Sequence, residues 1–258
     1  MSPIDVALLV LAGFAASAVN ALAGGGSLIT FPTLVALGLP PVAANVTNSL
    51  GVSPGYAASV VGSRTDLADL ARRRGRRSLV ALLPTAVTGT AGGCALLLVT
   101  PARAFELVVP FLVLGATAVL AFQRRLRSLV GHPRDLTPQQ RRLALHALVL
   151  LGSAYGGYFG AALGVMLVAV LALVLDESLQ HISALKNAIS AVAGLVTVVA
   201  FALFGPVDWT AVAVLVPATI AGGYAGARLL TRLPATVLRV LIVGIGTVVG
   251  IALLVASI

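Results

Sequence analysis

A run of three glycines directly before a serine is the first feature of the sequence that predicts binding chemistry. Gly24, Gly25 and Gly26 precede Ser27 within a long stretch that has no charged residue. If a helix starts at Ser27, backbone N–H groups are free at its N-terminus, where the helix dipole favours an anion. A tight hairpin turn is the alternative interpretation of the same residues. The run therefore predicts either an anion site or a turn.

Two polar dipeptides occupy equivalent places early in two apolar stretches. They are Thr47-Asn48 and Lys186-Asn187, and Lys186 is the only lysine in a chain with sixteen arginines. Ionisable groups inside membrane segments are costly and usually face a cavity or a partner. In the functional interpretation, Lys186 selects for an anion and the two asparagines project toward the same midplane. The alternatives are amides that cap helix starts and a lysine that snorkels to the membrane interface.

A second glycine-rich segment, Gly156–Gly160, lies inside another uncharged stretch. Tyr155 directly precedes this segment and Tyr158 lies within it. Non-helical backbone at membrane depth is tolerated only where it is buried in protein or lines an aqueous cavity. We therefore expect a second helix break here, with Tyr158 and Gly160 as candidate binding residues.

The residue types required for soluble enzyme chemistry and for metal binding are missing or scattered. The sequence has no HExxH, GxxxxGK[ST] or GxSxG motif, and its three histidines, His132, His146 and His181, are far apart. Cys94, the single cysteine, lies in an apolar span, where a packing role is the ordinary one. An intramembrane serine protease built on Ser27 has no histidine in a neighbouring helix interior. We expect no catalytic residues, no metal and no cofactor.

The elements that must position these residues are membrane helices. Hydrophobic residues make up 59% of the 258 residues and charged residues only 10%, with a mean hydropathy of +1.06. A bilayer core needs about 20 apolar residues per helical span. Seven stretches without Asp, Glu, Lys or Arg are the candidates: 6–63, 78–102, 107–123, 143–175, 187–207, 209–227 and 240–258. They predict one polytopic α-helical membrane domain.

The net charge of +9 is concentrated between the hydrophobic stretches. Residues 64–77, 123–142 and 228–239 carry net charges of +4, +5 and +3. Short basic loops of this kind face the cytoplasm by the positive-inside rule. The basic charge is therefore interpreted as topology, and no nucleic-acid partner is expected.

An internal repeat organises the chain into two halves. With an offset of 139 residues Gly25 falls on Gly164 and Asn48 on Asn187, and with an offset of 133 Pro84 falls on Pro217. The loop after the first asparagine helix is basic and its counterpart, 205–208, is acidic, as an inverted-topology repeat requires. We expect a first repeat over 1–125, a cytoplasmic linker over 126–142 and a second repeat over 143–258.

The predicted fold class is an all-α polytopic membrane protein with two inverted-topology repeats. Each repeat is a broken helical hairpin plus three spanning helices. The first hairpin is a helix near 4–22, a break at the three glycines and a short piece over 27–37. The spans are expected near 43–62, 78–99 and 103–123, then 182–204, 209–230 and 235–256. Gly89 and Gly93, with their counterparts Gly222 and Gly226, are expected to pack helices closely.

Several of these segments together resemble a known family, the TauE/SafE sulfite exporters. The resemblance rests on residues 20–27 (NALAGGGS), Phe31-Pro32, residues 44–48 (ANVTN), residues 156–161 (GGYFGA) and Leu185-Lys186-Asn187. It extends over both halves. It implies a bacterial inner-membrane secondary transporter for small sulfur-containing anions such as sulfite, sulfoacetate or related organosulfonates.

The sequence therefore predicts a secondary transporter of a small sulfur oxyanion or sulfonate that works by alternating access, with proton coupling as an option. A non-transporting membrane accessory protein and a transporter of a small carboxylate are the alternatives. The expected partners are the anion, the lipid bilayer and a second copy in a homodimer. The expected substrate-binding residues are Gly24, Gly25, Gly26, Ser27, Thr47, Asn48, Tyr158, Gly160, Lys186 and Asn187.

Overall fold

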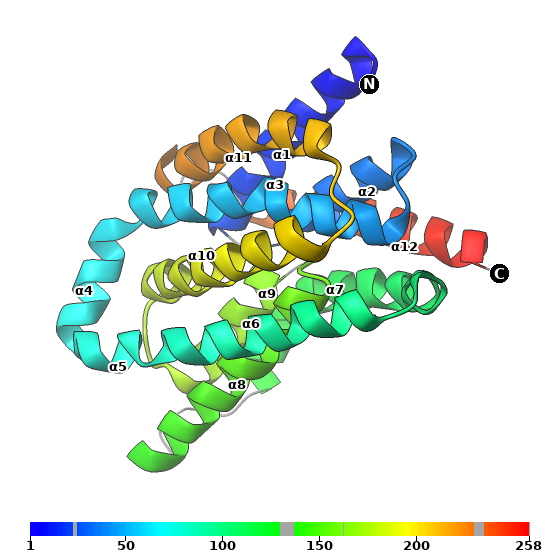
Figure 1. Cartoon of the computed structure of the whole chain (residues 1–258). Helices are drawn as coiled ribbons and strands as arrows, with labels where there is room; N and C mark the ends of the chain where they lie inside the picture. Colours follow the sequence, from blue (N-terminus) through cyan, green and yellow to red (C-terminus); the bar gives the residue numbers. More distant parts are fainter. Residues whose placement is uncertain (23–24, 130–136, 162, 230–234, 258) are drawn as a thin grey trace.

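The structure is a computed structural model that describes residues 1–22, 25–129, 137–161, 163–229 and 235–257 (Figure 1). These residues form helices and no strands. The helices are α1 (Pro3–Leu22), α2 (Ser27–Ala36), α3 (Pro41–Gly62), α4 (Arg64–Arg74), α5 (Arg76–Val80), α6 (Leu82–Val99), α7 (Ala102–Leu129), α8 (Pro138–Tyr158), α9 (Leu163–Val174), α10 (Leu179–Phe204), α11 (Trp209–Leu229) and α12 (Ala235–Ser257).

Five described segments are long and apolar enough to cross a membrane by length and composition. They are Pro3–Ala21, Arg76–Val99, Ala102–Val119, Gln180–Phe204 and Trp209–Arg228. The predicted fold class is confirmed to this extent: the chain is an all-helical, multi-pass membrane protein. Helix α3 is not among the five because its interior is polar, and its asparagines and serines are buried against neighbouring helices. A polar helix inside a membrane bundle is where a hydrophilic site is expected.

Both helix breaks predicted from the glycines are present. Helix α1 ends at Leu22 and α2 starts at Ser27, while α8 ends at Tyr158 and α9 starts at Leu163. Gly25 and Gly160 have φ angles of 87° and 74°, in the left-handed region that glycine adopts without strain. Each half therefore begins with a helical hairpin made of one long and one short piece.

The basic segment after α3 is more ordered than the expected loop. It forms α4 and α5, and Leu70 of α4 is completely buried against residues of the second half. Helix α7 continues to Leu129, and α8 begins at Pro138. Thr137 and Gln140 form a capping box that fixes the start of α8.

The glycine pairs pack helices closely, as predicted. A Cβ at Gly89 or Gly93 would lie 2.5 Å or less from a main-chain carbonyl oxygen of α8, and one at Gly222 or Gly226 would lie 2.4 Å or less from one of α1. Helix α6 thus packs on α8 in the way that α11 packs on α1. Small residues allow this approach and maximise dispersion contacts where no hydrophobic effect drives association.

Helix contacts within the bundle are reciprocal between the halves. Helices α3 and α10 lie side by side in the centre, α6 lies beside α10, and α4 crosses the end of the bundle (Figure 1). Helix α7 packs on α12, α1 on α11, and α8 on α6. Under the predicted repeat equivalence, the contact of α1 with α11 corresponds to that of α8 with α6, and the contact of α6 with α10 corresponds to that of α11 with α3. The contacts of α3 with α10 and of α7 with α12 each correspond to themselves. The opposite membrane orientation of the halves, and their boundaries at 125 and 143, stay predictions.

Candidate functional site

The first helix break is held against α1 by close backbone packing. A Cβ at Gly26 would lie 1.8 Å from the carbonyl oxygen of Ala16, so only glycine fits. The Gly26 N–H donates a 2.7 Å hydrogen bond to Oδ1 of Asn20. One donor of the predicted anion-binding N-terminus is therefore occupied by an amide of the same hairpin. Gly24 lies outside the described residues.

The second break contacts the first through aromatic rings and α3. Phe159 lies edge-on to Phe31 of α2, with ring centroids 5.3 Å apart. Asn45 of α3 donates through Nδ2 to the carbonyl oxygen of Tyr158 at 3.0 Å, and the Tyr155 hydroxyl donates to the carbonyl oxygen of Ala161 at 2.7 Å. These contacts satisfy backbone carbonyls that the break removes from the helical ladder.

A narrow polar cavity lies where α2, α3, α10 and the second break meet. It measures about 20 Å³, which is space for about one water molecule. Predicted site residues Ser27, Asn48 and Gly160 line it. The other lining residues are Ser49, Val52, Ser53, Tyr56, Gly156, Leu163, Ala193, Gly194 and Thr197. Hydroxyl and amide groups with no carboxylate make a surface that can hydrogen-bond an anion.

The polar groups around this cavity are arranged by local hydrogen bonds. Thr30 of α2 donates to Oδ1 of Asn48. Ser49 and Ser53 donate to carbonyl oxygens one turn earlier in α3. These hydroxyls can rotate toward a ligand without moving the backbone.

Lys186 is buried beside the first break and not in the cavity. Its side chain is 1% exposed, and Nζ donates a hydrogen bond to the carbonyl oxygen of Asn20. None of the ion pairs among the described residues includes Lys186. Asn20 thus joins the lysine to Gly26, since its carbonyl accepts from Lys186 and its side chain accepts from the Gly26 N–H.

Asn187 lies next to this group and binds the ends of two helices. Its Nδ2 donates to Ser63 Oγ at 3.2 Å and to the carbonyl oxygen of Ala21 at 3.5 Å. Asn187 Oδ1 and Asn20 Nδ2 are both buried, and neither has a hydrogen-bond partner among the described residues. A buried donor without an acceptor, close to a buried ammonium, marks a place where an anion would be stabilised.

Two predicted residues lie apart from both groups. Thr47 accepts a hydrogen bond from the Asp208 N–H at 3.0 Å and so fixes the corner between α10 and α11. The Tyr158 ring packs against Phe105, with centroids 5.8 Å apart. The structure therefore brings Ser27, Asn48 and Gly160 together at the cavity, and Gly26, Lys186 and Asn187 together around Asn20.

Sequence reasoning missed several residues of these two groups. Ser49 and Ser53, which line the cavity, are four residues apart, which places them on one face of a helix, and this spacing could have identified them. Asn20 gave no such signal. Its role depends on a contact with residue 186, which only the packing of α1 on α10 creates.

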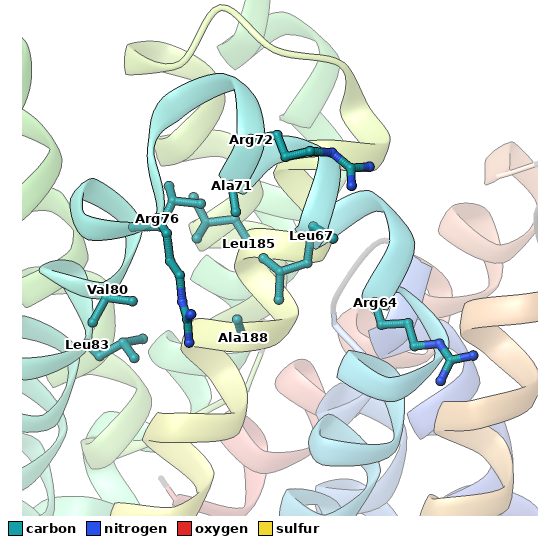
Figure 2. Close-up of a pocket in the computed structure, with 11 residues that line it drawn as sticks. Arg64, Leu67, Ala71, Arg72, Arg76, Val80, Leu83, Leu185 and Ala188 are labelled. Carbon is teal, nitrogen blue, oxygen red and sulfur yellow. The ribbon is translucent and has the colours of Figure 1, made fainter.

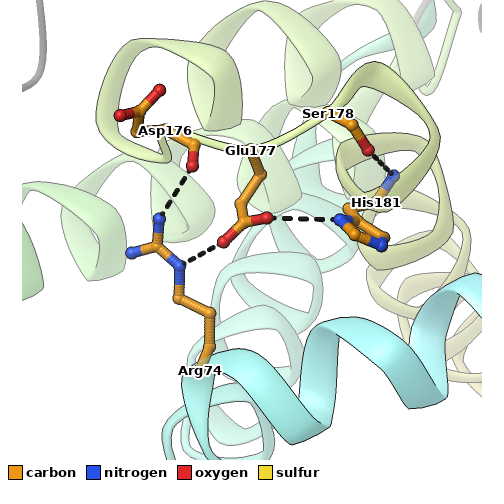
Figure 3. A network of polar contacts seen from close by, with 5 residues as sticks. All are labelled: Arg74, Asp176, Glu177, Ser178 and His181. Atoms are coloured by element: carbon orange, nitrogen blue, oxygen red, sulfur yellow. Dashed lines mark hydrogen bonds and ion pairs between the residues drawn. The ribbon is translucent and has the colours of Figure 1, made fainter.

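A polar network connects α4 to the corner between α9 and α10 (Figure 3). Arg74 donates through Nε to Glu177 Oε1 at 2.8 Å, and its Nη2 lies 3.3 Å from the carbonyl oxygen of Asp176. Glu177 Oε2 lies 3.2 Å from His181 Nδ1. Burial alone would raise the pKa of Glu177, but hydrogen bonds from Arg74 and His181 hold that pKa below its usual range. The network ties the basic segment of the first half to the second half.

Comparison of the sequence with known protein families identifies a match over nearly the whole chain. The family described as "Sulfite exporter TauE/SafE" matches residues 9–253. The chain belongs to the TauE/SafE family. This is a family of membrane transporters, and the match extends over both helix breaks and both asparagine helices of the TauE/SafE chain described above.

Two of three curated relatives are similar over nearly the whole length of both chains. A protein of Haemophilus influenzae named "Probable membrane transporter protein" is 28% identical over 92% of this chain and 90% of its own. The "Probable membrane transporter protein YfcA" of Escherichia coli K12 is 26% identical over 98% of this chain and 91% of its own. A Sinorhizobium protein, "Probable membrane transporter protein ORF9", is 30% identical over 62% of this chain and 58% of its own. No solved structure matches the chain.

Proposed function

We propose that this protein is a secondary transporter that moves a small sulfur-containing oxyanion or organosulfonate, such as sulfite or sulfoacetate, across the bacterial inner membrane by alternating access. The observation that carries the proposal is the buried Lys186, which is 1% exposed and has no carboxylate partner in the described part of the chain. An uncompensated ammonium in a membrane bundle is costly, and a bound anion offsets that cost.

The neighbouring groups suit a small oxyanion in number and kind. Asn20 Nδ2 is an unpartnered buried donor among the described residues. Asn187, the residue after Lys186, carries a second amide, whose Nδ2 donates to Ser63 Oγ and to the carbonyl oxygen of Ala21. Ser27, one residue beyond Gly26, reaches the cavity that Asn48 and Gly160 also line. An oxyanion with three oxygens accepts hydrogen bonds on several sides, and charge-assisted hydrogen bonds are the strong ones. Lys186 supplies charge, and the amides and hydroxyls supply orientation.

The transport step uses the two broken hairpins. The cavity is too narrow for an oxyanion, so binding requires the surrounding helices to move apart. The hairpins meet at Phe31 and Phe159. The matching helix contacts of the two halves support a mechanism in which the halves exchange conformations, so that the site opens first to one side of the membrane and then to the other. In this mechanism Lys186 takes up a proton when the anion binds and releases it when the site is empty.

Uptake into liposomes tests the proposal. Purified protein is reconstituted, and the entry of labelled sulfite, sulfoacetate and acetate is compared with protein-free liposomes and with a Gly92→Ala variant, whose added Cβ meets no atom within 4 Å. We expect saturable uptake of a sulfur anion by wild type and Gly92→Ala, and a loss of at least tenfold in Lys186→Gln, whose residual uptake no longer depends on pH.

Three other results would contradict the proposal. Uptake of acetate alone would make the protein a carboxylate transporter. No uptake of any anion by folded protein would favour the accessory-protein alternative. Wild-type uptake by Lys186→Gln at every pH would remove the lysine from the mechanism.

A further inference from the structure

A groove of about 460 Å³ opens at the end of the bundle, between α4, the start of α6 and α10 (Figure 2). Its walls are apolar: Leu67 and Ala71 come from α4, Val80 and Leu83 from α5 and α6, and Leu185 and Ala188 from α10. Lys186 lies between the last two in sequence but turns toward α1, so the groove is separate from the site around Asn20. The apolar lining gives a small inorganic anion nothing to bind on the groove floor.

The border of this apolar groove is positively charged. Arg76 extends along one border, with Val80 and Leu83 on one side of its side chain and Ala188 on the other (Figure 2). Arg64 and Arg72 lie at the opposite border. Arg72 pairs with Asp69, whereas Arg64 and Arg76 form no ion pair with another described residue. A cavity with an apolar floor and a basic edge is complementary to an anionic amphiphile.

The position of the groove indicates that the amphiphile is a membrane lipid. Helix α4 is short and polar and follows α3 directly, and α5 forms the beginning of the apolar segment Arg76–Val99. The Val80 side chain is 49% exposed at the outer wall. A groove at the junction of a basic interfacial helix and a membrane span is in reach of lipid, and basic pockets between membrane helices bind lipid headgroups.

We propose that this groove binds one anionic phospholipid, with an acyl chain along the apolar walls formed by Leu67 and Leu185 and the phosphate on Arg76. The bound lipid fills the space between α4 and α10. It therefore fixes α4, and through Arg74 the corner at Glu177, at the end of the bundle.

Fluorescence quenching by brominated lipid tests this proposal in the full chain. A Val80→Trp substitution is placed on a Trp209→Phe background, which removes the single native tryptophan. The protein is put into phosphatidylcholine nanodiscs that contain a small fraction of phosphatidylglycerol with brominated acyl chains. Lipid that mixes at random quenches in proportion to its mole fraction. We expect brominated phosphatidylglycerol to quench several-fold more than its mole fraction predicts. Brominated phosphatidylcholine is expected to quench only in proportion to its mole fraction.

Matched variants separate a specific lipid site from nonspecific contact with the bilayer. Arg76→Gln is expected to lower the apparent affinity for phosphatidylglycerol about fivefold, whereas Arg103→Gln, at an exposed arginine on α7, leaves it unchanged. Ala68→Phe, which narrows the groove from α4, is expected to abolish the excess quenching.

The proposal is overturned if brominated phosphatidylglycerol quenches only in proportion to its mole fraction. It is also overturned if Arg76→Gln and Arg103→Gln behave alike. Competition by glycerol phosphate as strong as that of the intact lipid would make the groove a site for free phosphate and would equally reject the acyl-chain placement. Folding of each variant is monitored by its elution as a single species in detergent.

Discussion

Lys186 of α10 is hydrogen-bonded to the main chain of Asn20 at the end of α1, across 166 positions of sequence. The side chain of the same asparagine accepts from Gly26 at the first helix break. A shift of α1 relative to α10 would therefore act on both the lysine and the start of α2. This relationship makes Asn20 the residue through which the charge and the break are coupled.

An aspartate at position 20 is expected to replace the transported anion. Asn20→Asp places a carboxylate beside Lys186, where it pairs with the ammonium that is otherwise without a carboxylate in the described residues. We expect the variant to fold, to melt at or above the wild-type temperature, and to lose anion uptake by about tenfold or more. Thermal unfolding and liposome uptake check the two effects, and an Asn20→Asp protein that transports normally would separate Lys186 from the substrate.

The close approach of the first break to α1 should be intolerant of any side chain. A Cβ at Gly26 would lie 1.8 Å from Ala16 O, while one at Gly92 would meet nothing within 4 Å. We expect Gly26→Ala to lower the free energy of unfolding by about 1–3 kcal/mol or more. Gly92→Ala is expected to change the free energy of unfolding little. Unfolding in detergent measures both. Equal stability of the two variants would show that the hairpin is not packed as described.

The contact between Arg74 and Glu177 should contribute to stability in a pH-dependent way. A double-mutant cycle with Arg74→Gln and Glu177→Gln is expected to give a coupling of about 1–3 kcal/mol at neutral pH, because both side chains are largely buried and hydrogen-bonded. The exposed pair of Arg103 and Glu106 is the control, with an expected coupling of less than about 1 kcal/mol.

The sign of the pH dependence follows from the lowered pKa of Glu177. A carboxyl group whose pKa is lower in the folded state contributes its full stability above the unfolded pKa of about 4.3. That contribution is lost as the pH falls below this value and through the lowered folded-state pKa. When the cycle is repeated from neutral to acid pH, the coupling energy should stay constant above the unfolded pKa and decline below it. A coupling that grows on acidification would contradict the assignment.

The opposite orientation of the two halves is open to direct labelling. Single cysteines at Arg72 and Pro206, both exposed, are introduced on a Cys94→Ala background, since Cys94 is buried. We expect a membrane-impermeant maleimide to reach position 206 from outside intact cells and position 72 only in inside-out vesicles. Labelling of both positions from the same side would reject the inverted repeat.

The sequence alone determined the membrane class, the helix breaks and the close-packing glycines of this protein. Each depends on local chemistry: an apolar run long enough for a bilayer, a backbone conformation such as that of Gly160 that glycine adopts freely, or a spacing such as Gly89 and Gly93 that puts two small residues on one helix face. These properties are fixed by a few neighbouring residues, so they can be read without knowing what lies across the bundle.

Only the tertiary structure decided which polar residues meet. Asn48 and Asn187 are equivalent in the repeat, yet Asn48 lines the cavity with Ser27, while Asn187 binds Ser63 beside the end of α1. Asn20 became part of the site through a contact with Lys186. A hydrogen bond between residues 166 positions apart depends on the rotation and register of two packed helices. Those are set by the sum of many weak contacts along both helices, and no local pattern in the sequence encodes them.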